Sequence, residues 1–130
     1  MRLLLDTHVV LWAISQDRRL TSQAEDLLDA SEHVLIVSAV SILEIAIKNA
    51  LPKPRSNIDI TANRVLELLT GSGIEMLPAS PRHAAAVEEL PPIHNDPFDR
   101  LLVAQALTEP LILVTHDRIV ASYSNNFILI

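Results

Sequence analysis

The chain has 130 residues, 49% of them hydrophobic, which is enough for one ordinary domain over residues 1–130 with a buried core. Only two glycines and no cysteine are present, which excludes glycine-rich phosphate loops, disulfides, thiolate zinc sites and a cysteine nucleophile, and favours the cytoplasm. The net charge of −6 excludes a broad basic surface for duplex binding. No apolar run reaches the roughly 18 residues that a membrane span needs.

The first half of the chain predicts two strands and three helices. In chain order these are a strand at Leu3–Leu5, helices at about Thr7–Ser15 and Ser22–Ala30, a strand at Val34–Val37, and a helix from about Ser38 to Ala50. Thr21 and Ser38 are candidate N-caps, because their side-chain oxygens can accept hydrogen bonds from the first helical N–H groups. Pro52 and Pro54 end the third helix.

The second half continues the alternation of apolar strands and helices. In chain order it predicts a helix at about Thr61–Thr70, a strand at Ile74–Leu77, helices at about Ser80–Leu90 and Asp96–Thr108, a strand at Leu111–Val114, a short turn or helix at Asp117–Tyr123, and an edge strand at Phe127–Ile130. Asp59 is a candidate cap of the first of these helices. The pattern predicts an α/β fold, with a small parallel sheet of four or five strands flanked by helices on both faces.

Carboxylates follow two of the predicted strands. Asp6 comes directly after the first strand, and Asp117 follows the fourth strand after Thr115 and His116. Ligands of open parallel sheets bind beyond the carboxyl ends of the strands, so both acids emerge at that edge of the sheet. If the two strands are neighbours, these acids are within reach of one another.

Two helices add further acids. Ser41, Glu44 and Lys48 form one narrow polar stripe on an otherwise apolar helix, and this stripe faces either solvent or a polar cleft. A surface ion pair between Glu44 and Lys48 is the structural alternative. Asp96 and Asp99 crowd the N-terminus of another helix, where Asp99 can also simply complement the helix dipole.

An oxygen-only cluster of this kind is typical of a site for Mg²⁺ or Mn²⁺. Clustered carboxylates repel one another, and a bound cation removes that conflict. The cation also activates a water molecule and neutralises charge on a phosphodiester. Lys48, Lys53 and Arg55 form a small positive stretch that could hold phosphates beside the site.

Some of these residues also have a purely structural interpretation. Asp6, Asp96 and Asp117 stand where helix caps are expected. Thr7 and Thr115 are candidate strand-end caps that could also support the site or the substrate.

The histidines carry less weight, because none has a second histidine at metal-ligand spacing. His8 and His116 follow strand ends and can touch the site. His94 precedes the acidic helix, whereas His33 and His83 are expected at the surface.

Four segments together resemble a PIN-domain protein of the VapC-type toxin group: LLLDTHVVLWA, SAVSILEIAIK, HNDPFDRLLVAQAL and LVTHD. They occur in the family's order and span Leu3 to Asp117. The resemblance implies an endoribonuclease that depends on Mg²⁺ or Mn²⁺ and forms the toxin component of a toxin–antitoxin pair. The residues that match the family's metal-binding acids are Asp6, Glu44, Asp99 and Asp117, with Asp96 as an additional acid and Thr115 as the small hydroxyl residue near the metal.

The resemblance also implies a mechanism and partners. Water would attack an RNA phosphodiester, leaving a 5′-phosphate and a 3′-hydroxyl, and Glu44 or Asp99 would help to deprotonate that water. Lys48 would steady the substrate phosphate. Members of the family typically form homodimers and bind a cognate antitoxin, which lays a helix in a groove near the first helices. The apolar helix around Trp12 is compatible with such a groove.

Two other classes of function stay open on the residues alone. A phosphohydrolase or a receiver-like phosphotransfer domain also places acids around Mg²⁺, with an aspartyl nucleophile such as Asp6. A non-catalytic interaction module would use the same acids only as helix caps. A trapped aspartyl-phosphate analogue would favour the first, and unchanged stability with Mn²⁺ would favour the second.

Overall fold

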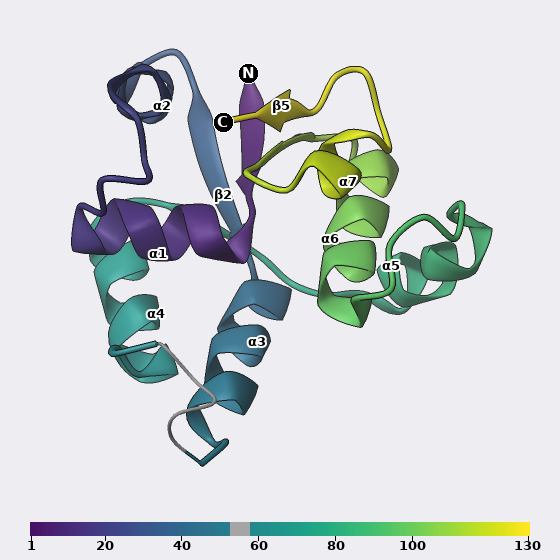
Figure 1. Ribbon diagram of the computed structural model, residues 1–130, viewed down its shortest axis with the longest axis horizontal. Helices are drawn as coiled ribbons and strands as arrows, with labels where there is room; N and C mark the ends of the chain where they lie inside the picture. Colours follow the sequence, from purple (N-terminus) through teal and green to yellow (C-terminus); the bar gives the residue numbers. More distant parts are fainter. Residues whose placement is uncertain (53–57) are drawn as a thin grey trace.

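A computed structural model describes residues 1–52 and 58–130 and has the predicted α/β architecture (Figure 1). The strands are β1 (Arg2–Leu5), β2 (Val34–Ser38), β3 (Glu75–Leu77), β4 (Ile112–Thr115) and β5 (Ile128–Leu129). The helices are α1 (Thr7–Ser15), α2 (Ser22–Asp29), α3 (Ala39–Asn49), α4 (Ala62–Gly71), α5 (Pro81–Ala86), α6 (Pro97–Thr108) and α7 (Arg118–Ala121), with a 3₁₀ turn η1 (Val87–Glu89). Within these residues no helix is both long and apolar enough to cross a membrane.

The sheet is parallel throughout and runs in the order β3-β2-β1-β4-β5. The first strand is therefore central, with β2 on one side and β4 on the other. Leu3 pairs with Leu35 of β2, and Leu5 pairs with Val114 of β4. The sequence left open whether the first and fourth strands are neighbours, and the structure pairs them, so the residues that follow β1 and β4 leave the sheet side by side.

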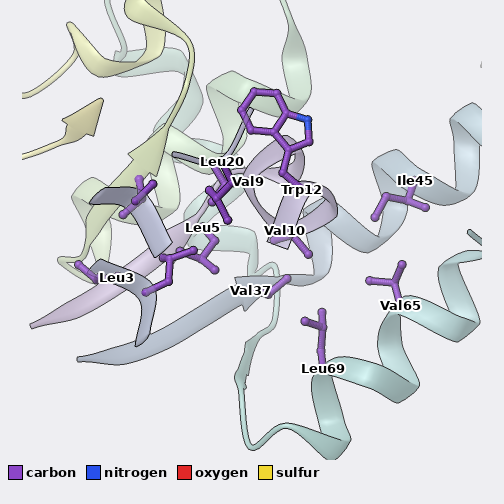
Figure 2. Close-up of a cluster of buried hydrophobic side chains, with 13 residues drawn as sticks. Leu3, Leu5, Val9, Val10, Trp12, Leu20, Val37, Ile45, Val65 and Leu69 are labelled. Carbon is purple, nitrogen blue, oxygen red and sulfur yellow. The ribbon is translucent and has the colours of Figure 1, made fainter. Parts of the chain in front are cut away.

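Alternation along the strands divides the core between the two faces of the sheet. Leu3 and Leu5 belong to one buried cluster, which α1, α2 and α4 complete (Figure 2). Leu4 belongs to the other cluster, which α6, β4 and α7 complete. Because successive strand residues point to opposite faces, the apolar residues 3–5 of β1 are buried on both sides of the sheet. The prediction of helices on both faces is confirmed.

Most helix caps follow the sequence signals. The side chains of Thr21, Ser38, Ser80, Asp96 and Asp117 each accept a backbone N–H at the start of a helix. Asp59 was expected to cap α4, but the cap is Thr61, whose Oγ1 accepts from the Arg64 N–H at 3.1 Å. The helix expected to reach Leu90 divides into α5 and η1.

His83 is not at the surface, as the sequence predicted, but is 3% exposed. Its Nδ1 accepts the Ser80 N–H, which completes a capping box at the start of α5. Its Nε2 contacts Glu109. Gln105 of α6 lies against the same ring and accepts a hydrogen bond from Ser38. This buried network ties the end of β2 to α6. Sequence reasoning missed it, because a histidine near a helix start is usually exposed.

Candidate metal centre

Asp6 directly follows β1, the central strand, at the carboxyl ends of the strands. Thr115, at the end of β4, donates its hydroxyl hydrogen to Oδ2 of Asp6 over 2.6 Å. Asp6 stands at the N-cap position of α1, but its side chain makes no capping hydrogen bond. The other carboxylate oxygen, Oδ1, is buried and finds no hydrogen-bond partner within the described residues. The capping interpretation of Asp6 is therefore wrong, and Oδ1 is an oxygen left free for a cation.

The polar stripe of α3 faces inward. Ser41 and Glu44 are buried, whereas the apolar residues Leu43 and Ile47 on the same helix are exposed. Thr7 lies against the stripe, with its Oγ1 2.9 Å from Ser41 Oγ and 2.7 Å from Glu44 Oε1. Thr7 is the first residue of α1 and holds Glu44, so its expected role as a strand-end cap is wrong.

Lys48 is the cation nearest to Glu44 in the described structure. Its Nζ donates to Glu44 Oε2 over 2.6 Å, one helical turn away on α3. Glu44 is 3% exposed and Lys48 is 36% exposed, so the pair is not the surface ion pair considered as the alternative. Lys53 and Arg55, which were expected to extend this positive charge, lie outside the described residues.

The N-terminus of α6 brings two more carboxylates to the same edge. Asp96 caps the helix, because its Oδ1 accepts the N–H groups of Phe98 and Asp99 at 2.8 and 3.3 Å. Burial, and after it the negative charges of Asp6, Asp96 and Glu44, raises the pKa of Asp99 to about 7. Asp6, Glu44 and Asp96 therefore lie close enough to Asp99 for their charges to act on it.

Asp117 is linked to this cluster by His94, a histidine to which the sequence analysis gave less weight. One oxygen of Asp117, Oδ1, caps α7, and the other, Oδ2, lies 3.1 Å from His94 Nε2. The same Nε2 is 3.2 Å from Asp99 Oδ2. Donor atoms of these three side chains all lie within 4.8 Å of one another. The only available signal was the position of His94 two residues before a helix cap, which does not reveal where the ring points.

The pKa values of the acids differ because their surroundings differ. Burial raises the pKa of Asp6, and the Thr115 hydrogen bond offsets only part of that rise. Burial also acts on Asp117, but hydrogen bonds from His94 and from the Ile119 and Val120 N–H groups lower its pKa overall. A carboxyl group has a raised pKa where neighbouring groups do not compensate its negative charge. A bound cation would supply that compensation.

The donor set fits a hard divalent cation. Carboxylate oxygens predominate, and the partnerless buried oxygen of Asp6 gives the cluster an unused donor. Mg²⁺ and Mn²⁺ prefer oxygen donors, whereas a zinc site typically contains thiolates or several imidazoles. Asp6, Glu44, Asp96, Asp99 and Asp117 are the residues that would hold such an ion.

An aromatic group borders the acids on the α1 side. His8 lies close enough to Asp6 and Glu44 to interact with their charges, while burial and the nearby His116 lower its pKa. The His116 ring centroid is 4.7 Å from that of Trp12, and the Arg19 guanidinium lies 4.9 Å from the Trp12 ring centroid. Trp12 is 8% exposed, so its expected role in core packing is confirmed.

Comparison with known protein families decides the classification. The family model of the PIN domain matches residues 3–125. The chain belongs to the PIN-domain family. Proteins with a PIN domain are generally nucleases that use divalent metals, and the acidic edge described above lies within the matched residues of this PIN domain.

Solved structures share the PIN fold of this chain at low sequence identity. VapBC2 from Rickettsia felis, bound to a DNA fragment from its promoter, has a TM-score of 0.70 and 19% identity, covering 100% of this chain and 98% of that one. FitAcB from Neisseria gonorrhoeae has a TM-score of 0.67 and 18% identity, covering 98% and 96% of the two chains. DNA-bound VapBC from Salmonella typhimurium has a TM-score of 0.60 and 14% identity, covering 100% and 97%. No curated protein sequence matches the chain significantly.

Proposed function

We propose that this PIN domain is a metal-dependent endoribonuclease and the VapC-type toxin of a toxin–antitoxin pair, acting in the cytoplasm. The observation that carries the proposal is the crowding of Asp99 by three other carboxylates beside the buried, partnerless oxygen of Asp6. A receiver-like phosphotransfer domain is not favoured, because the chain matches the PIN family over residues 3–125. A module that uses its acids only as caps is not favoured either, because Asp6 makes no cap bond.

The acids divide into ligands and supports. Asp6, Glu44, Asp99 and Asp117 would hold Mg²⁺ or Mn²⁺, with Asp96 as an additional ligand through the oxygen that does not cap α6. The bound cation would lower the pKa of a coordinated water and neutralise charge on the scissile phosphodiester. Thr115 keeps Asp6 in its orientation by a hydrogen bond, and Thr7 does the same for Glu44.

The protein's own residues would then position the water and move its proton. Asp99 is one candidate base: burial and the neighbouring carboxylates raise its pKa to about 7 in the metal-free protein, and a bound cation would lower that pKa. Glu44 is the other candidate base, but its Oε2 is already engaged by Lys48. Lys48 is partly exposed, which would allow its ammonium group to steady a phosphate at the rim of the site. Cleavage would leave a 5′-phosphate and a 3′-hydroxyl.

An antitoxin and a second copy of the chain are the proposed protein partners. A groove of about 610 Å³ between α1, α2 and α4 is lined by apolar residues that include Val10, Ile14, Leu28 and Leu68. This groove supports the binding of an apolar helix from the antitoxin. The exposed apolar side chains Leu43 and Ile47 on α3 are compatible with a homodimer, which size-exclusion chromatography with light scattering would test.

Cleavage of RNA by the Asp6→Asn variant tests the proposed function. This isosteric change removes one negative charge at the centre of the cluster, so we expect Mn²⁺-dependent cleavage to disappear while the circular dichroism spectrum stays native. The matched control is Asp26→Asn, at an exposed position on α2, which should cleave as wild type does. Undiminished cleavage by Asp6→Asn, or wild-type cleavage that persists in EDTA, would contradict the assignment.

A further inference from the structure

We propose that His94 is a positioning residue of this site: its Nε2–H donates to Asp117 Oδ2 and lies against Asp99 Oδ2, so that the ring holds the two carboxylates together without ligating the metal itself. The proposal rests on the proposed metal site and adds a residue to it. Taken by distance alone, His94, Asp99 and Asp117 look like three ligands of one ion. The hydrogen bond on the far side of the ring argues otherwise.

The tautomer of His94 is fixed by a backbone group. The Asp96 N–H donates to His94 Nδ1 over 3.0 Å. A backbone N–H can only donate, so Nδ1 must offer its lone pair and carries no hydrogen. The neutral imidazole therefore carries its hydrogen on Nε2, the atom that faces Asp99 and Asp117 at 3.2 and 3.1 Å.

This arrangement is the reverse of that found in a metal-bound histidine. A histidine that ligates a metal through one ring nitrogen almost always donates from the other nitrogen to a carboxylate or carbonyl group. Here the other nitrogen faces a donor, so ligation through Nε2 would require a proton on Nδ1 and would set it against the Asp96 N–H. Donation from Nε2 conflicts with nothing, because both of its neighbours are carboxylate oxygens.

The loop that carries His94 is held in place by α6 and by the segment after α7. The His94 N–H donates to the Tyr123 hydroxyl over 3.2 Å, and that hydroxyl donates to the Pro91 carbonyl over 3.0 Å. Arg100 donates to the same Pro91 carbonyl at 3.0 Å and to the Val87 carbonyl at 3.1 Å. Hydrogen bonds with Tyr123 and Arg100 thus hold the loop that carries the imidazole in place.

Nitrogen-15 NMR of the histidine side chains, with and without Mg²⁺, tests the proposal directly. We expect His94 to show a protonated Nε2 and an unprotonated Nδ1 in the metal-free protein, and to keep that pattern when Mg²⁺ saturates the site. A proton on Nδ1 in the metal-free protein, or loss of the Nε2 proton on Mg²⁺ binding, would overturn it. The metal-free spectrum is decisive even if no metal binds, whereas failure of wild type to bind Mg²⁺ or Mn²⁺ would count against the proposed function.

Two substitutions separate the two ring nitrogens. In His94→Asn the amide oxygen takes about the place of Nδ1, so the acceptor for Asp96 is kept and the donor is lost. In His94→Gln the amide nitrogen reaches about the place of Nε2, so the donor to Asp117 beside Asp99 is kept. We expect Mg²⁺ affinity, measured by calorimetry, to fall about tenfold in the asparagine variant and to recover largely in the glutamine variant.

The control for these variants is His33→Asn, at a half-buried position at the opposite end of β2 from the acids, where Mg²⁺ affinity should not change. Circular dichroism and thermal unfolding of each variant verify that the fold is intact. Wild-type affinity in His94→Asn, or no recovery in His94→Gln with the fold intact, would show that the donor does not organise the site.

Discussion

Thr115 Oγ1 and Asp6 Oδ2 are joined by a hydrogen bond of 2.6 Å between residues 109 positions apart in the chain. The bond crosses from the end of β4 to the end of β1, and the same threonine oxygen accepts the Asp117 N–H at 3.0 Å. The Thr115 hydroxyl therefore orients Asp6, a proposed metal ligand, and also fixes the start of the turn that carries Asp117, another proposed ligand. The bond also leaves Asp6 Oδ1 as the free oxygen of that carboxylate.

Replacing this hydroxyl by a methyl group should weaken the site. In Thr115→Val the Asp6 carboxylate loses a hydrogen bond that lowers its pKa, and the buried Asp117 N–H loses its acceptor. We expect a loss of about 1–3 kcal/mol in the free energy of unfolding and roughly tenfold weaker Mn²⁺ binding. Urea unfolding and Mn²⁺ titration provide the measurements. Thr70→Val, at an exposed position on α4, should change neither quantity appreciably.

The raised pKa of Asp99 predicts how stability depends on pH. The folded protein keeps a proton on Asp99 up to about pH 7, whereas the unfolded chain releases it near the ordinary aspartate pKa of 3.8. The folded state therefore binds more protons between these values, and metal-free stability should fall as the pH rises from about 4 through about 7. Urea unfolding at several pH values, without divalent metal, measures the slope.

Asp99→Asn isolates this contribution. The variant should lose much of the decline in stability and exceed wild type by roughly 1–3 kcal/mol at pH 8 without metal. Added Mg²⁺ should stabilise wild type more at pH 8 than at pH 5, because protons compete with the cation at low pH. Stability of the metal-free wild type that rises between pH 4 and 7 would contradict the assignment of Asp99 as a crowded carboxyl.

Lys48 should contribute more to stability than an ordinary surface lysine. Lys48→Met leaves Glu44 buried without its positive neighbour, so we expect a loss of about 1–2 kcal/mol without metal, part of which Mg²⁺ restores. The matched control is Arg64→Met, which breaks the exposed pair of Arg64 and Glu67 and should cost less than about 1 kcal/mol. Equal losses in the two variants would show that Glu44 does not need a cation.

Two leucines of α6 test the packing of that helix against the sheet. Leu102 is 1% exposed and belongs to the core cluster that contains Leu4, whereas Leu107 is 47% exposed. Leu102→Ala should lower the free energy of unfolding by about 2–5 kcal/mol. Leu107→Ala should change it by no more than about 0.5 kcal/mol. Similar losses at the two positions would mean that α6 does not bury the face described.

Much of the fold could be predicted because its signals are local. The apolar run of β1, the cap and proline that start α6, and the cap that starts α5 each act within a few residues. Which side chain contacts a particular neighbour is not a local property, because it depends on how the chain packs. Asp59 was the expected cap of α4 and Thr61 was expected inside the helix, but the cap depends on which oxygen the loop brings to the Arg64 N–H, and that oxygen is Thr61 Oγ1.

For the site, the sequence by itself determined the acids and placed Asp6 and Asp117 at the carboxyl edge of the sheet, because the parallel direction of the strands follows from the alternation of strands and helices. That β1 and β4 are neighbours was decided only by the structure. Only the tertiary structure decided that Glu44 faces inward, that Asp6 does not cap α1, and that the ring of His94 turns toward Asp99 and Asp117. Those outcomes depend on packing between segments that are distant in the chain, and the hydrophobic periodicity of a sequence does not predict such contacts.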